Sequence, residues 1–484
     1  MTQSRRPNPT GIDLEYAVRV RAGGYDTGCI AAKFRSSFRI TLFVALQGQA
    51  MASLSISNFS CIASATFEIA PVSIIIGPQG SGKSVTTKLL YFLNDILMNF
   101  PQFAERGESF EDFKRALSKQ FAIWFPASAW GCHRFIINYT NGPFTARVLR
   151  RSKARKLQDE VSFAFSPWFE KEYRAAAELF EKSNERENLD SDALMQVSFE
   201  KSWRLREAIT NRIAVALEGA FVSRQTFIPA GRAFFTSIGR LVAGLEQVGS
   251  LDQVTIKFAR IFASIRDQHP SRFIRRDGSD DEYINKRSMY MNKFFGGEIN
   301  FGRETEFVAT DDGRRVPFAS LSSGQQELLP MWSLIDYYNQ MDGRRILPNS
   351  RRSGEILYIE EPEAHLFPSA QSLLMEFLIS SIARGKVSRK LVITTHSPYI
   401  MSQLNVFLKA GQLARRKKKN TEINSIVPRE CWLTDDQVSA YCIEEGKFRY
   451  IMDEDGLIDG RYLDAISEQI SMDFSKLLKI ESEL

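Results

Sequence analysis

The sequence predicts an α/β fold in which buried strands end in glycine-rich or polar segments and a mixed, mainly helical insertion separates the motifs. Three observations predict it. The apolar run 72–76 leads through a glycine-rich segment into a helical pattern over 85–98. Two later apolar runs, at 356–359 and 391–393, also end in polar residues. Ahead of these two runs, residues 101–225 are dominated by helical patterns rich in Phe, Lys and Glu.

The expected elements begin at residue 54. Residues 54–59 and 65–69 alternate apolar and polar side chains, which predicts half-buried strands. A hairpin at 136–149 turns at Asn141-Gly142, and a strand-rich stretch at 298–317 turns at Asp312-Gly313 before a helix at 325–338. The patterns divide the chain into a leader at 1–50, an N-terminal lobe at 51–100, the insertion at 101–225, a C-terminal lobe at 226–405, and a hairpin with a terminal helix at 406–484.

Composition limits the class of protein. The chain has 484 residues, 44% of them hydrophobic, which can fill the cores of two or three domains. The apolar runs near its N-terminus are far shorter than the roughly 20 residues that span a bilayer, so we expect no membrane segment. The cysteines are odd in number, scattered and without metal-ligand spacing, which is typical of the reducing cytoplasm. They are Cys29, Cys61, Cys132, Cys431 and Cys442.

The first 50 residues differ from the rest. They hold seven basic and three acidic residues, and so account for four of the net +6 charges. They lack clear periodicity and precede Met51, where a tightly patterned strand sequence begins. We interpret them as a disordered leader or a wrongly assigned start; a targeting peptide is the alternative, although no cleavage site is evident. Since the remaining chain is nearly neutral, contact with nucleic acid would depend on local basic patches.

The glycine-rich segment GPQGSGKS at 77–84 matches the phosphate-loop pattern. In this pattern Gly77, Gly80 and Gly82 let backbone N–H groups surround phosphates, Lys83 neutralises them and Ser84 binds Mg²⁺. The pattern alone is compatible with an ordinary glycine turn. Its position between a buried strand and a helix favours a site for ATP and Mg²⁺, because the helix N-terminus adds favourable charge.

The segment ILYIEEPE at 356–363 is an apolar strand that ends in adjacent carboxylates. We assign Glu360 to the Mg²⁺ ligands and Glu361 to polarising the attacking water, because a strand end can place successive side chains differently around a phosphate. The alternative is a solvated acidic loop. A third strand ends at His396, which could contact the γ-phosphate or, like many lone histidines at strand ends, serve only for capping or packing.

Together, four motifs resemble the phosphate loop, signature, acidic strand and switch histidine of ABC ATPases. They are GPQGSGKS at 77–84, LSSGQQE at 321–327, the strand 356–361, and TTH at 394–396. The resemblance implies an ABC-type P-loop head whose subunits pair head to tail as a dimer or a larger ring. It also implies that Ser323, Gly324 and Gln325, at the start of the helix near 325–338, cap the γ-phosphate held by Lys83 of the other copy.

Two further phrases resemble the overcoming-lysogenization-defect and RecF-like branch, which serves DNA repair and anti-phage defence. They are EEPEAHLFP at 360–368 and THSPYI at 395–400. A transporter subunit fits poorly because Lys83 and Ser322 lie 239 positions apart, and long-armed chromosome proteins need heptads that are not present here. The phrase FIPAGR at 227–232 also resembles this branch and makes Arg232 a candidate nucleotide-site residue; Gln225 is a candidate metal-sensing glutamine.

Three functional hypotheses follow. Residues 401–484 show no convincing Toprim nuclease pattern, and the chain resembles the ATPase subunits of two-component phage-defence systems, PARIS and Septu among them. The leading hypothesis is thus an ATP-driven sensor and scaffold that holds a separate nuclease. The second is a RecF-like repair ATPase that clamps DNA through the basic runs 147–156 and 415–419. In the third, ATP is a structural ligand with little turnover.

Overall fold

The computed structural model describes residues 51–184, 193–217, 220–238, 252–268, 281–302, 305–342, 354–384, 388–416 and 420–482. All described residues belong to one compact unit, Ala50–Leu484. The leader expected at 1–50 therefore lies outside the described residues.

Groups of strands and groups of helices follow one another along the described residues. The strands are β1 Ser53–Phe59, β2 Ile62–Glu68, β3 Val72–Ile76, β4 Ile136–Asn141, β5 Phe144–Lys153, β6 Lys156–Phe165, β7 Val222–Ile228, β8 Gly297–Phe301, β9 Glu306–Thr310, β10 Arg315–Pro317, β11 Gly354–Glu360, β12 Ser388–Thr395, β13 Val438–Glu444 and β14 Lys447–Tyr450. The α-helices are α2 Lys83–Glu105, α3 Phe110–Trp124, α4 Pro167–Asn184, α5 Ala193–Ala216, α6 Ala233–Ile238, α7 Gln253–Gln268, α8 Asp281–Phe295, α9 Ser323–Asp342, α10 Pro368–Arg384, α11 Pro398–Arg415, α12 Asn420–Ile426 and α13 Arg461–Ser482.

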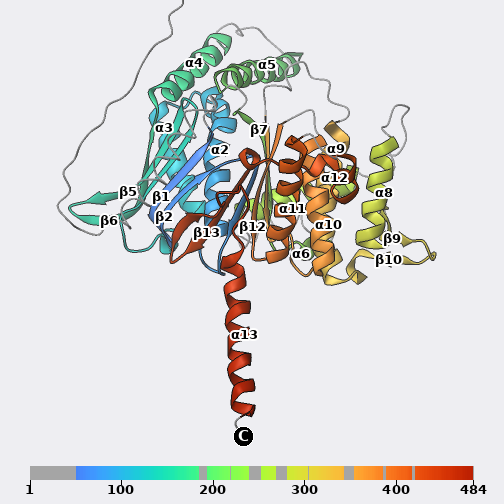
Figure 1. The fold of residues 1–484 in the computed structure, drawn as a ribbon. Helices are drawn as coiled ribbons and strands as arrows, with labels where there is room; N and C mark the ends of the chain where they lie inside the picture. The colour runs from blue at the N-terminus through green and yellow to red at the C-terminus, as the bar shows by residue number, and fades with distance from the viewer. Residues whose placement is uncertain are drawn as a thin grey trace, which may run out of the picture. The chain divides into compact units, whose positions relative to one another are not determined.

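One large sheet organises the described residues (Figure 1). It has 11 strands in the order β6-β5-β4-β1-β2-β14-β13-β3-β12-β11-β7. Its β13-β3-β12-β11-β7 half is parallel, whereas β1, β2, β4, β5 and β6 pair antiparallel. A second sheet has three strands in the order β10-β9-β8. The expected α/β class is thus confirmed.

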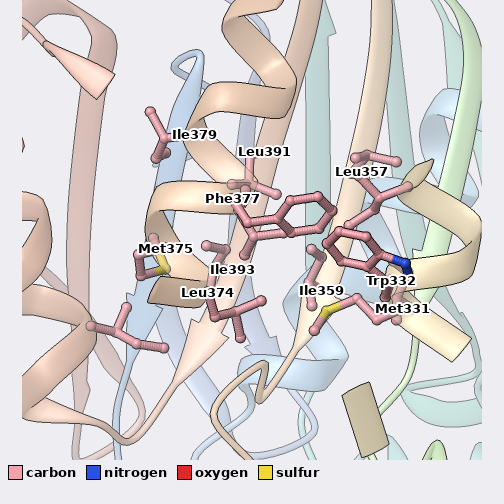
Figure 2. Packing of buried hydrophobic residues seen from close by; sticks show 14 of the residues in the cluster. Met331, Trp332, Leu357, Ile359, Leu374, Met375, Phe377, Ile379, Leu391 and Ile393 are labelled. Atoms are coloured by element: carbon pink, nitrogen blue, oxygen red, sulfur yellow. The ribbon is translucent and has the colours of Figure 1, made fainter. Parts of the chain in front are cut away.

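The central strands are buried on both faces, which explains their continuous apolar sequence. Successive side chains enter opposite cores: Ile74 packs in one hydrophobic cluster and Ile75 in the other. The first cluster lies against α9, α10 and α11, and Figure 2 shows Trp332 of α9 and Phe377 of α10 within it. The two rings stack with centroids 4.4 Å apart. Aromatic stacking of this kind adds to the burial that holds the helices on the sheet.

The insertion is not an independent domain. The described residues within 101–225 include the helices α3, α4 and α5. They also supply β4, β5 and β6, which extend the main sheet from the edge of β1, with Ile137 opposite Ile56. The hairpin of β4 and β5 was predicted, but its turn lies one residue later than the expected Asn141-Gly142, because Asn141 pairs with Phe144 and leaves Gly142 and Pro143 as the turn. Its pairing with β1 was not predicted, because strand period alone does not identify a partner.

The C-terminal hairpin likewise belongs to the main sheet. β13 pairs parallel with β3, placing Cys442 opposite Ile76, and Glu445 and Gly446 form its turn with φ of 48° and 73°. The separate C-terminal part that the sequence predicted therefore completes the sheet around the central strand.

Two expectations from composition can be compared with the described residues. None of the described helices is long and apolar enough to cross a membrane. The described cysteines are free thiols, with Cys61 and Cys132 exposed and Cys431 and Cys442 buried.

Candidate functional site

Parallel strand pairing brings the predicted motifs to one edge of the sheet. Ile76, the last residue of β3, lies opposite Thr395 of β12, and Thr394 lies opposite Glu360 of β11. The chain therefore leaves β3 toward the glycine-rich loop, β12 toward His396 and β11 toward Glu361 at the same edge. Segments separated by hundreds of residues meet there because carboxyl ends of parallel strands point the same way.

The glycine-rich loop has the backbone that phosphate binding requires. Gly80 and Gly82 have φ of 74° and 107°, a region open to glycine. A Cβ on Gly82 would also lie 2.7 Å from Ile62 Cγ1. Lys83 Nζ donates to the carbonyl oxygens of Gly77 and Pro78 at 2.8 and 2.9 Å, so the loop curves around the side chain of Lys83. The curve of the loop is thus fixed by its glycine conformations and by its own lysine.

The start of α2 is suited to an anion. Its N-cap is Gly82, no side chain caps it, and no acidic residue lies in its first turn. The first amides of a helix lack intrahelical partners and carry partial positive charge. Burial lowers the pKa of Lys83, and the carboxylates of Glu361, Glu363 and Glu360 oppose that shift. Phosphate groups fit these donors by charge and by hydrogen bonding.

Glu360 and Ser84 are the oxygen ligands that the sequence predicted for Mg²⁺. Burial raises the pKa of Glu360, while hydrogen bonding from the Ser84 side chain acts in the opposite direction. Glu360 Oε1 is buried without a hydrogen-bond partner in the described residues. Carboxylate and hydroxyl oxygens are ligands that Mg²⁺ prefers, and a buried unpaired carboxylate oxygen is costly without a cation. The two residues therefore fit the metal that the sequence predicted.

Glu361 and His396 lie side by side beyond the strand ends. Their Oε1 and Nε2 atoms are 3.3 Å apart, although the approach lacks hydrogen-bond geometry. Both side chains are partly exposed. The backbone of Glu361 is left-handed, with φ of 44°, and its amide donates to the Thr394 carbonyl at 2.9 Å. Non-glycine residues in this region are strained and cluster at functional sites.

The sequence did not identify Glu363 as part of the site. Its Oε1 accepts from the Thr395 hydroxyl and from the His396 amide, both at 2.7 Å. This carboxylate therefore holds the backbone that carries His396. A carboxylate two residues after Glu361 was visible in the sequence, but only the neighbouring position of β12 gives it this partner.

The signature segment forms the first turn of α9. Ser322 and Gln325 cap the helix reciprocally. The backbone amide of Gln325 donates to Ser322 Oγ at 3.4 Å, and the backbone amide of Ser322 donates to Gln325 Oε1 at 3.2 Å. Ser323 is exposed. Gly324 is buried, and a Cβ there would lie 2.6 Å from the His365 carbonyl oxygen. The Gln325 side chain also donates to the Phe294 carbonyl, so it is used within the chain.

Two predicted residues have other roles. Arg232 is 0% exposed, and its guanidinium donates to backbone carbonyls, which leaves it no surface for the nucleotide contact that the sequence predicted. Gln225 lies opposite Ile356, far down the strand from Glu360, and donates to the Tyr91 carbonyl at 2.9 Å. It is therefore not placed to sense a metal.

Comparisons with known proteins agree with part of this picture. Residues 251–401 match the model of the AAA ATPase domain family (AAA_15), a segment that includes Ser323, Glu360, Glu361 and His396 but not the glycine-rich loop. No curated protein matched the chain.

Solved structures of related architecture superpose weakly. The SMC head domain from Thermotoga maritima is 13% identical over 83% of this chain and 98% of that one, with a TM-score of 0.32. An SMC head bound to the C-winged helix domain of ScpA is 11% identical over 82% and 96%, with a TM-score of 0.33. A nucleotide-free ATP-binding cassette of an ABC transporter is 10% identical over 84% and 93%, with a TM-score of 0.28. Similarity at this level carries no argument about function.

Proposed function

We propose that the chain binds ATP with Mg²⁺ and hydrolyses it, and that a second copy of the chain completes each active site. One observation carries the proposal. The loop lysine Lys83, the next residue Ser84, the buried Glu360, and the neighbouring Glu361 and His396 converge at one sheet edge from three separate segments. This constellation contains the parts that phosphoryl transfer needs: phosphate donors, metal ligands and a base for water.

Each residue has one role in this proposal. Lys83 and the loop amides hold the phosphates, and Ser84 with Glu360 holds Mg²⁺, which supplies positive charge to the transferred group when bound. Glu361 accepts the proton of the attacking water. His396 donates to an oxygen of the γ-phosphate. Its backbone is fixed by Glu363, so the imidazole position depends on β11 as well as β12.

The surface around the site supports pairing of two copies. Exposed aromatic side chains lie close in sequence to residues of the proposed site or to the buried arginine that contacts it: Phe367 after the loop that follows Glu361, Tyr399 after His396, and Phe234 after Arg232. Their exposed fractions are 75%, 49% and 45%. Aromatic residues are enriched at the centres of protein interfaces. A partner that covers them would bring its own Ser323 and α9 amides to this nucleotide.

Hydrolysis by the purified chain tests the proposal. We expect Lys83→Ala to lose ATP binding. We expect Glu361→Gln to bind ATP, to hydrolyse it about 10² to 10⁴ times more slowly, and to accumulate as an ATP-bound dimer detectable by native mass spectrometry. Absence of Lys83-dependent ATP binding would contradict the proposal. Undiminished function of Glu361→Gln in cells would instead favour ATP as a structural ligand.

We further propose that the ATPase is the sensor and scaffold of an anti-phage complex with a separate nuclease, as in the PARIS subunit AriA. The phrases at 360–368 and 395–400 support this role by resemblance. Isolation from the native host with ATP and Mg²⁺ tests it. A nuclease that copurifies with an oligomer from the parent, but not from Lys83→Ala, is the expected result. Equal phage protection by a folded Lys83→Ala variant would exclude an ATP-driven sensor.

DNA binding is the second candidate, and a specific hairpin favours it. The side chains of Lys153, Arg155 and Lys156 are exposed at the turn between β5 and β6, and none of them is ion-paired within the described part of the chain. By contrast, Arg415 of the other basic run pairs with Asp435 and Asp436 at 3.1 and 2.9 Å. Basic side chains without an acidic partner can contact DNA phosphates, whereas a basic side chain that is already paired with carboxylates, such as Arg415, is less suited to do so.

The salt dependence of DNA affinity tests this candidate. If the hairpin contacts phosphates, replacing Lys153, Arg155 and Lys156 with Gln weakens ATP-dependent DNA binding and reduces the salt slope by about 0.9 for each lost contact. The control is Arg415→Gln, which removes a cation already paired with acids. If the hairpin variant and Arg415→Gln change DNA affinity equally, or if neither changes it, the hairpin is not a DNA clamp.

A further inference from the structure

A fully buried arginine connects two parts of the proposed active site. Arg232 follows β7 and lies between α9 and the end of β11. On one side its backbone amide donates to Glu327 Oε2 at 2.9 Å, and its Nε donates to the Glu327 carbonyl at 3.0 Å. Glu327 belongs to the second turn of α9, the helix that begins with Ser323.

On the other side the same guanidinium holds the end of β11. Arg232 Nη1 donates to the Glu360 carbonyl at 2.7 Å and to the Pro229 carbonyl at 3.0 Å. Arg232 Nη2 donates to the Glu361 carbonyl at 3.2 Å. One planar group thus joins the signature helix to the backbone of both acidic residues of the site.

The backbone of Glu361 needs such support. Its φ of 44° is strained for a residue with a side chain, and such conformations persist only where surrounding bonds hold them. Its amide donates to the Thr394 carbonyl at 2.9 Å, and its carbonyl accepts from Arg232. Both peptide groups that flank the Glu361 side chain are therefore anchored, one to β12 and one to Arg232.

We propose that Arg232 is a positioning residue that couples the signature helix α9, through Glu327, to the proposed general base Glu361. This inference rests on the proposed ATPase function and adds a connection within it. Displacement of α9 when its N-terminus meets the partner's nucleotide moves the Glu327 carbonyl and carboxylate. The rigid guanidinium transmits this displacement to the Glu361 carbonyl, and so to the carboxylate that accepts the water proton.

A charge-preserving substitution separates this role from simple charge compensation. Lys in place of Arg232 keeps one positive charge but cannot span the Glu327 carbonyl and the two β11 carbonyls, because an ammonium lacks the planar array of donors. The matched control is Arg389→Lys. Arg389 is also buried, and its Nε lies 3.1 Å from Glu355 Oε2, but Glu355 is at the opposite end of β11 from Glu361.

Two measurements on the full-length variants test the proposal. In the first, ATP affinity and kcat are determined together. We expect Arg232→Lys to keep the Kd for ATP within about twofold, since the loop around Lys83 is untouched, and to lower kcat by about 10- to 100-fold. We expect Arg389→Lys to lower the denaturation midpoint without this loss of kcat. A fall in kcat that parallels lost stability in both variants would overturn the proposal.

The second measurement does not depend on hydrolysis. Amide hydrogen exchange of peptides covering 358–366 should accelerate by at least about tenfold in Arg232→Lys and stay at the parental rate in Arg389→Lys, because only the first loses the anchor of the Glu361 carbonyl. Unchanged exchange in Arg232→Lys would overturn the proposal. If the parent protein binds no ATP but exchange accelerates, the proposed function fails, and what stands is only that Arg232 anchors the backbone of Glu361.

Discussion

At the scale of single residues, Glu360 combines burial with negative charge. Its pKa is raised by burial, so folding favours the protonated carboxyl and the ionised form opposes folding. The favourable contribution is fully present below the unfolded pKa, near 4.5, and is lost as the pH rises through the folded pKa. At neutral pH the protein therefore carries a destabilising group, which is common where a site is built for a cation.

The substitution Glu360→Gln should expose this cost. We expect it to raise the unfolding free energy at pH 7.5 by on the order of 1 kcal/mol, because the neutral amide removes a buried charge. The gain should disappear near pH 4, where the carboxyl is protonated in the parent as well. Thermal denaturation at both pH values measures it, and stabilisation by Mg²⁺ with ATP should be lost.

The control for this experiment is Glu454→Gln, since Glu454 is exposed and its charge is already solvated. It should leave the denaturation midpoint unchanged at either pH. The positive charge of Lys88 also acts to lower the pKa of Glu360. A destabilised Glu360→Gln variant at pH 7.5 would mean that Ser84 and Lys88 together compensate the buried carboxylate fully.

At the scale of elements, the first turn of α9 lies against the loop that follows β11. Gly324 faces that loop so closely that a Cβ would lie 2.6 Å from the His365 carbonyl oxygen and 3.1 Å from Leu366 Cδ2. His365 itself has a left-handed φ of 59°. The close approach, together with Arg232 and Glu327, makes the position of α9 depend on the backbone that carries Glu361.

Gly324→Ala tests this dependence. In a free helix the change from Gly to Ala stabilises by about 1 kcal/mol, but here the added methyl group meets backbone that cannot move aside freely. We expect a loss of about 1 to 3 kcal/mol in the unfolding free energy and slower ATP hydrolysis. The exposed neighbour provides a control, because Ser323→Ala should change stability by less than about 0.5 kcal/mol. A stabilised Gly324→Ala variant would disprove the tight contact.

At the scale of the whole molecule, the proposed active site is divided between copies. Within one chain, Ser323 is exposed, whereas Glu327 one turn later is buried against Arg232. The exposed aromatic residues next to the site provide a surface on which a second copy can lie. Assembly and catalysis should therefore be coupled.

Phe367→Asp should separate these two properties. Phe367 is 75% exposed, so the substitution should leave the stability of the monomer unchanged while placing a charge in the proposed interface. We expect ATP binding to persist, the ATP-dependent increase in mass to be lost, and hydrolysis to fall at least about tenfold. Ile426→Asp is the matched control, since Ile426 is 80% exposed but is the last residue of α12, which carries none of the site residues. Dimers of normal affinity from Phe367→Asp would place the interface elsewhere.

The sequence by itself determined the local chemistry. The glycine-rich loop, the acidic residues at the end of β11, the histidine after β12 and both hairpins were predicted because each depends on a short segment with its own spacing of glycines, charges or apolar residues. The first hairpin turns one residue later than expected, at 142–143. The helix after the loop was predicted over 85–98 and extends over Lys83–Glu105, since helix ends depend on packing more than on periodicity.

Only the tertiary structure decided how these segments are connected. Arg232 was expected beside the nucleotide, but long-range pairing of β7 with β11 buries it between α9 and the strand end. The same pairing places Gln225 away from the metal, and the position of β12 gives Glu363 its bond to His396. Strand period indicates which faces are buried but not which strands are neighbours, so the contacts that unite the site come from the order of the sheet.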